Sequence, residues 1–287
     1  MRTHIIENDY IKVTVADAGA ELSSIIDKAT GAERLWCADP SVWNRHAPVL
    51  FPFVGRVAGG EYRVGGKAYA MKTQHGFARD MEFECVGQTP DSVSHCLTYT
   101  DDTLKIYPYR FRLTVTHSIC KREVTVKWKI ENLGDGLMYY SIGGHPAFML
   151  PDPKEDSFVF FPGKTDVEYF SVAPDGLALP DKPHTLRTDG GYVPFDTSVY
   201  DTWVFAHQGI DTVGLAGADK KPYVTLRCPG FPLLAVWANP KGSFICLEPW
   251  YGRTDDSGFT GSLDAKPEVQ TLAPDGEKSI EYSIEIN

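Results

Sequence analysis

The sequence predicts an all-β protein built as a large antiparallel β-sandwich. Apolar and polar residues alternate with a period of two in several segments, which is typical of strands with one buried and one solvated face. Glycine and proline, 26 and 20 of the 287 residues, recur at short intervals and favour many turns. No segment shows the pattern of an amphipathic helix longer than a few turns. Many strands with short connections favour two packed sheets.

Four segments alternate most clearly and are expected to be half-buried strands. They are residues 11–15, 111–119, 124–130 and 280–286. The second and third are joined by the four residues 120–123, which predicts a hairpin.

Three other segments are more continuously apolar, which suits central strands covered on both faces. They are residues 223–228, 233–238 and 244–247. Residues 173–196 are rich in Pro, Gly and Asp and are expected to form a long surface excursion. No linker, repeat or low-complexity tract divides the chain, so one domain spanning residues 1–287 is expected.

Charge and composition exclude some classes of partner. The formal net charge is -10, with a pI near 5.3, and such a surface repels nucleic-acid backbones. A local pair of arginines could still bind one small anion. The first residues show no apolar signal region, and no apolar stretch has the length of a membrane span. A cytoplasmic protein without a membrane partner is therefore expected.

The six cysteines contain no C-x-x-C pair and lie mostly in apolar, strand-like segments. They are expected to be buried reduced thiols rather than disulfides or zinc ligands. No His-Glu-x-x-His motif occurs, and no two histidines have metal-ligand spacing, so no metal is expected. The cysteines are Cys37, Cys85, Cys96, Cys120, Cys228 and Cys246.

Three turn segments each place a proton-handling side chain beside aromatic residues, which equips them for general acid/base chemistry near neutral pH. They are far apart in sequence, so only the fold can bring them together. The segments are Thr73–Arg79 with His75, Gly143–Phe148 with His145, and Cys246–Gly252 with Glu248.

Each of these side chains also has a purely structural interpretation. His75 could simply bond a backbone carbonyl in its turn, and taken alone this is favoured. His145 follows two glycines at the end of a predicted strand, where function and structure are evenly balanced. Glu248 ends an apolar run, where desolvation raises its pKa towards that of a useful base. Its alternative is an ion pair with Arg253.

Four further residues are candidates for binding. Arg56 follows an apolar segment into a glycine turn, and Trp250 could stack on a sugar face. Arg79 could instead form a surface ion pair with Asp80 or Glu82. Asp201 could accept sugar hydroxyls, although capping a strand turn is favoured for it.

Four motifs, taken in order, resemble the aldose 1-epimerase (mutarotase) family. They are Val54-Gly55-Arg56, Gln74-His75-Gly76-Phe77-Ala78-Arg79, Gly143-Gly144-His145-Pro146-Ala147-Phe148 and Leu247-Glu248-Pro249-Trp250. The resemblance covers nearly the whole chain and is nearest to a short bacterial epimerase-like branch associated with lactose operons. It implies the galactose mutarotase-like β-supersandwich, in agreement with the strand pattern.

The resemblance also implies a role for each matching residue. Glu248 matches the family's catalytic base and His145 its catalytic acid. His75 matches a second histidine that helps to hold the sugar, and Arg56 matches a substrate-binding arginine.

The remaining matches concern the identity of the sugar. Gln74 and Arg79 match a motif of the hexose-6-phosphate branch, where it contributes to an anion site. Asp201 matches the sugar-binding aspartate loosely. The Asn-Arg and His-Gly-Gly sequences typical of galactose mutarotases are absent, and Thr73 stands where related sequences often have proline. The sugar is therefore left open.

The implied reaction interconverts the α and β anomers of a hexose by ring opening and closure. Glu248 would take the proton of the C1 hydroxyl while His145 protonates the ring oxygen. No cofactor is implied, and the expected partner is a small aldose or sugar phosphate bound by a monomer or homodimer. The alternatives are a hexose-6-phosphate 1-epimerase and a non-catalytic carbohydrate-binding protein. A lyase or glycosidase is disfavoured because those enzymes would need an additional domain.

Overall fold

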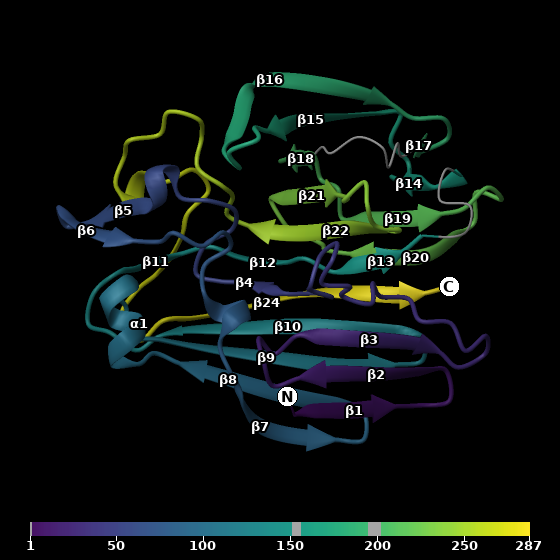
Figure 1. The fold of residues 1–287 in the computed structure, drawn as a ribbon, viewed down its shortest axis with the longest axis horizontal. Coiled ribbons are helices and arrows are strands. Elements are labelled where there is room, and N and C mark those ends of the chain that lie inside the picture. The colour runs from purple at the N-terminus through teal and green to yellow at the C-terminus, as the bar shows by residue number, and fades with distance from the viewer. Residues whose placement is uncertain (1, 151–155, 195–201) are drawn as a thin grey trace.

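Two large sheets and three small ones make up the computed structural model, which describes residues 2–150, 156–194 and 202–287 (Figure 1). Neighbouring strands of the large sheets pair antiparallel, as β9 does with β10 and β21 with β22. The predicted all-β architecture is confirmed. Asp201, a candidate from the sequence, lies outside the described residues.

The nine-stranded sheet contains most of the alternating segments. The predicted hairpin of residues 111–119 and 124–130 is confirmed, with Cys120 opposite Glu123 at its closed end. In spatial order the strands are β17 (Tyr192–Pro194), β14 (Phe158–Phe160), β19 (Thr212–Ala216), β20 (Pro222–Arg227), β24 (Glu277–Ile286), β10 (Glu123–Asn132), β9 (Phe111–Cys120), β8 (Ser92–Thr98) and β7 (Glu84–Thr89).

The eight-stranded sheet contains two of the three continuously apolar segments as its central strands, β21 and β22. Strand β13 (Ala147–Met149) pairs with β22 beside the main path of the sheet. In spatial order the other strands are β16 (Ala178–Arg187), β15 (Asp166–Val172), β18 (Thr202–Ala206), β21 (Leu233–Trp237), β22 (Phe244–Tyr251), β12 (Ile142–Gly144) and β4 (Val49–Leu50).

The small elements surround these two sheets. The one α-helix of the described residues, α1 (Asp101–Ile106), begins at a capping box formed by Thr100 and Thr103. The 3₁₀ turns are Ala58–Gly60, Ala78–Asp80 and Leu263–Ala265. The small sheets are β1 (Thr3–Glu7), β2 (Ile11–Ala16) and β3 (Leu22–Asp27), then β5 (Glu61–Val64) with β6 (Lys67–Ala70), and β11 (Met138–Tyr140) with β23 (Gln270–Leu272).

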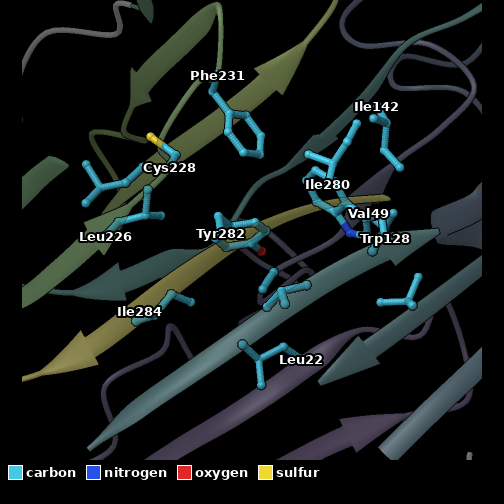
Figure 2. Close-up of a cluster of buried hydrophobic side chains, with 14 of the residues drawn as sticks. Leu22, Val49, Trp128, Ile142, Leu226, Cys228, Phe231, Ile280, Tyr282 and Ile284 are labelled. Atoms are coloured by element: carbon cyan, nitrogen blue, oxygen red, sulfur yellow. The ribbon is translucent and has the colours of Figure 1, made fainter. Parts of the chain in front are cut away.

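One apolar cluster joins the inner faces of the sheets (Figure 2). Trp128 of β10 is fully buried at its centre, and its ring lies 5.3 Å from that of Tyr282 and 6.1 Å from that of Phe231. Ile280 is its cross-strand partner on β24, and Leu22 of β3 belongs to the same cluster. The core thus spans segments from both ends of the chain.

Two expectations from the sequence are wrong. Residues 173–196 are not only a surface excursion, because β16 pairs with β15 at the edge of the sheet. Pro180 and Pro183 suggested a loop, but an edge strand tolerates proline because one side needs no ladder hydrogen bonds. The expected burial of all six cysteines also fails. Only Cys228 and Cys246 are buried, although all six are free thiols.

Truncating the central side chain should show how much the core depends on it. We expect Trp128→Ala to lower the free energy of unfolding by about 3–5 kcal/mol, because a large cavity forms without water to fill it. Chemical denaturation would measure this. Lys127→Ala, on the exposed face of the same strand, is the matched control and should stay within about 0.5 kcal/mol of wild type. A loss below about 1 kcal/mol for Trp128→Ala would contradict the central role of this ring.

Candidate active site

Glu248 lies in the middle of β22, on the face turned away from the main core. The period of two places Ile245 and Leu247 in the main core cluster, while Trp250 packs in a separate cluster on the opposite face. The cross-strand partner of Glu248 is Ala235, whose small side chain leaves space beside the carboxylate. Glu248 is 1% exposed. The apolar run therefore buries a carboxyl group within a sheet.

His145 lies in the connection between β12 and β13, directly after two glycines. A Cβ on Gly143 would lie 2.6 Å from the Trp250 ring, and one on Gly144 would lie 2.8 Å from the Tyr282 hydroxyl. Both positions therefore need glycine for close packing. His145 is 6% exposed, and its place at a strand end agrees with the sequence.

The fold brings His145 and Glu248 into contact. Their Nε2 and Oε2 atoms are 3.3 Å apart. Within the described residues, neither Glu248 Oε2 nor His145 Nδ1 has a hydrogen-bond partner. The imidazole ring stacks on Trp43, with centroids 5.0 Å apart, and meets Trp237 edge-on at 5.6 Å. Two buried polar atoms thus remain able to form hydrogen bonds beside the rings of Trp43 and Trp237.

Burial moves the two pKa values in opposite directions. It raises the pKa of Glu248 well above its usual range, and the Trp250 indole and the Arg79 guanidinium oppose this rise. Burial, followed by the charge of Arg79, lowers the pKa of His145 to about 3. The indole Nε1 of Trp250 is near enough to favour the carboxylate, although it does not meet hydrogen-bond geometry. These opposite shifts favour the proton on Glu248 over His145 whenever the pair holds one proton.

His75 is fixed in a neutral state by its backbone contacts. It adopts a positive φ of 67°, and its Nδ1 accepts the amide N–H of Gly55 at 3.0 Å. The neutral ring therefore carries its proton on Nε2, which lies 2.9 Å from the Gln74 carboxamide. The amide oxygen must face this N–H, because two N–H groups would repel each other. Burial and then the charge of a protonated His145 lower the pKa of His75 well below its usual range.

The two candidate arginines differ in their surroundings. Arg79 donates from Nη2 to the Gln74 carbonyl at 2.7 Å, and its Nε is buried without a partner in the described part of the chain. The alternative ion pair with Asp80 is absent, since Asp80 pairs with Arg45. Arg56 is exposed, and no carboxylate among residues 2–150, 156–194 and 202–287 lies within ion-pair distance of it.

A pocket of about 680 Å³ joins these groups. It is lined by every candidate site residue that the structure describes, namely Arg56, Gln74, His75, Arg79, His145, Glu248 and Trp250. It is also lined by residues that the sequence did not point to, among them Trp43, Trp237, Asn239 and Thr254. Trp237 could have been found, because strand alternation puts it on the same face as Ala235. Trp43 lies in a loop without any such signal.

The structure also decides one alternative at the site. Glu248 does not pair with Arg253, which bonds instead to Asp256. His145, Cys246 and Glu248 offer possible metal-ligand atoms within 4.8 Å of one another. Burial raises the pKa of the Cys246 thiol well above its usual range, so a cation bound here would have to displace the thiol proton.

No helix in the described part of the chain is long and apolar enough to cross a membrane.

Comparisons with known proteins agree with this geometry. The family model described as aldose 1-epimerase matches residues 2–221, which include every candidate site residue except Glu248 and Trp250. The LacX proteins of Lactococcus lactis subsp. lactis, chromosomal and plasmid, are 29% identical over an alignment of 298 positions that covers 98% of this chain and 98% of LacX. This full-length similarity includes β22.

Solved structures show the same fold over the whole chain. A galactose mutarotase related enzyme from Lactobacillus acidophilus is 30% identical with a TM-score of 0.94, over 100% of this chain and 97% of that one. A galactose mutarotase-like protein from Lactobacillus casei is 28% identical with a TM-score of 0.91, over 100% of both chains. The chain belongs to the aldose 1-epimerase family, in a branch that resembles LacX.

Proposed function

We propose that this chain is a mutarotase that interconverts the α and β anomers of a hexose at the pocket around Glu248 and His145. The observation that carries the proposal is the 3.3 Å contact between these two buried side chains inside a pocket of about 680 Å³. The C1 hydroxyl oxygen and the ring oxygen of an aldose are bonded to the same carbon. An acid and a base this close together can therefore reach both oxygens at once.

The proton balance requires one proton on the pair. In the ring-opening step Glu248 takes the hydroxyl proton of C1, and His145 gives its proton to the ring oxygen. The C1–O5 bond breaks and a carbonyl forms at C1. After rotation about C1–C2, the ring closes with the roles reversed, so no net proton is consumed.

The opposite pKa shifts favour this proton on Glu248, so substrate binding has to move it to His145. Sugar hydroxyls that donate to the carboxylate would lower the pKa of Glu248, and Arg79 acts in the same direction. The short Nε2–Oε2 separation gives the proton a direct path. His75, Gln74 and the Trp250 ring would hold the sugar, since neutral donors and an aromatic face suit its hydroxyls and C–H groups.

A hexose 6-phosphate is the second candidate substrate. The supporting observation is Arg56, an exposed cation at the pocket without a carboxylate partner in the described residues. Arg79 supports it less, because one of its donors is used to brace the Gln74 carbonyl. A binding protein without catalysis would have no need to bury a glutamate against a histidine, because that burial is costly.

Glu248→Gln tests the base. The change keeps the shape of the side chain and removes its proton transfer, so anomer exchange of α-glucose or α-galactose should fall by at least about 10²-fold. NMR exchange spectroscopy with the solvent-catalysed rate subtracted would measure it. Near-normal exchange by the folded variant would remove Glu248 from the mechanism.

The same variant should not lose stability. A carboxyl whose pKa is raised in the folded state binds its proton more tightly there than in the unfolded chain. The stability that the protonated Glu248 contributes to the folded state is fully present below the pKa of the unfolded chain, near 4.5. It is lost as pH rises through the pKa of the folded state. Glu248→Gln lacks this loss, so its Tm should exceed that of wild type at neutral pH, and the gap should close towards pH 4. A lower Tm at pH 7 would contradict the burial argument.

The pH profile of kcat/KM should be a broad bell. The active pair holds one proton, and it gains a second as pH falls through the pKa of His145, about 3. It loses the only proton as pH rises through the raised pKa of Glu248. Activity should therefore persist at pH 5, where an ordinary histidine is already charged. An acid limb centred near 6.5, the usual histidine pKa, would count against this assignment.

Substitution of each of the two arginines should distinguish a neutral hexose from a hexose 6-phosphate as the substrate. Arg79→Ala removes the brace of the His75 turn and a charge beside the reacting pair, so turnover of glucose and glucose 6-phosphate should fall together, by roughly 10- to 100-fold. Arg56→Ala should spare glucose. If the phosphosugar is a true substrate, its KM should rise about 10-fold or more in this variant, and added sulfate should compete with it. Equal behaviour of both sugars in Arg56→Ala leaves a neutral aldose as the substrate.

A further inference from the structure

A second cluster of titratable side chains lies outside the pocket, where the small sheet β1–β3 meets the edge of the nine-stranded sheet. His4 comes from β1, Cys85 from β7 and His95 from β8, and their ligand atoms lie within 4.8 Å of one another. Cys85 and His95 are direct cross-strand partners. None of the three lines the active-site pocket. The proposed epimerase reaction makes no use of them.

One carboxylate orients both imidazole rings. Asp17 Oδ1 lies 2.8 Å from Nε2 of His4 and 3.1 Å from Nε2 of His95. A carboxylate oxygen can only accept, so each ring places an N–H on Nε2 and keeps Nδ1 as the atom with a free lone pair. Protein metal sites orient their histidine ligands in the same way. A carboxylate accepts from one ring nitrogen, and the other nitrogen is left free for the metal.

The free nitrogens lack suitable partners. Nδ1 of His95 is buried and has no hydrogen-bond partner in the described residues. Nδ1 of His4 lies 2.8 Å from Oε1 of Gln88. The Gln88 amide nitrogen donates to the Ile5 carbonyl at 3.0 Å, which fixes the oxygen toward the ring. A lone pair and a carbonyl oxygen at this distance repel each other, so a cation belongs beside them.

We propose that His4, His95 and Cys85 bind a zinc-like divalent cation, with Gln88 Oε1 or a water as the fourth ligand. Two imidazole nitrogens and one thiolate match the preference of Zn²⁺. Donor atoms around tetrahedral zinc are about 3.3–3.8 Å apart, so ligation would draw the three side chains together and would move Gln88 Oε1 away from its 2.8 Å contact with His4 Nδ1. Cys85 can follow, because it lies on an edge strand beside a break in the β7–β8 register. The bound cation would fasten β1 to β7 and β8.

Cobalt substitution tests the proposal on the full-length protein. Metal-free protein titrated with Co²⁺ should bind one equivalent and show a thiolate-to-cobalt charge-transfer band with the d–d absorption of a tetrahedral site. Saturating Zn²⁺ should raise the Tm. Cys85→Ser should abolish the charge-transfer band and the Tm rise. Asp17→Asn should weaken binding by about 10- to 100-fold, because it removes the oriented second shell.

Two matched variants locate the site. Cys96→Ser changes a neighbouring half-buried thiol on β8 and should leave the spectrum unchanged. Glu248→Gln alters the other group of possible ligands, in the active-site pocket, and should also leave it unchanged. A spectrum insensitive to Cys85→Ser, or one lost in Glu248→Gln, would overturn the proposal. The absence of any cobalt band would overturn it as well.

Discussion

Glu248 is a carboxyl group placed within one of the most apolar strands of the molecule. An isolated carboxylate at 1% exposure would cost several kcal/mol, so the surroundings must either keep it protonated or compensate its charge. They do both in part. Burial favours the acid, while Arg79 and the Trp250 indole favour the carboxylate. The proposed chemistry depends on this balance, because a bound sugar would have to shift it towards the carboxylate.

The backbone holds the other site residues in place. The turns at Gly55 and His75 are joined twice, by the Gly55 amide to the His75 ring and by the His75 amide to the Gly55 carbonyl at 2.7 Å. The amide of Arg56 is bound by Thr254, and Asp255 binds the Ala58 amide while pairing with the buried Lys266. Hydrogen bonds within the protein therefore hold the pocket wall in place before a substrate binds. Such preorganisation lowers the cost of positioning the site residues.

The sequence predicts the sheets better than it predicts the site. Alternation identifies strands directly, because burial of one face imposes a period of two. It also finds Glu248 as a polar residue in an apolar run, but places it at a strand end. Pro249 does not end the strand, because it pairs with Leu234 and β22 continues to Tyr251. Trp43 escapes prediction because its stacking on His145 joins a loop to a distant turn, and local periodicity holds no information on such contacts.

Buried histidine–carboxylate contacts occur at two places in the described residues, where His145 meets Glu248 and where Asp17 meets both His4 and His95. His145 and Glu248 line a cavity of about 680 Å³, and Glu248 Oε2 and His145 Nδ1 have no hydrogen-bond partner in the described residues. His4 and Asp17 are enclosed between strands, and Gln88 closes the far side of the ring. Spacing along the sequence could not reveal the second cluster, because its members come from three different strands. The proposed proton transfer thus uses a histidine–glutamate contact that lines a cavity, whereas the proposed cation site uses two histidines that Asp17 holds between strands.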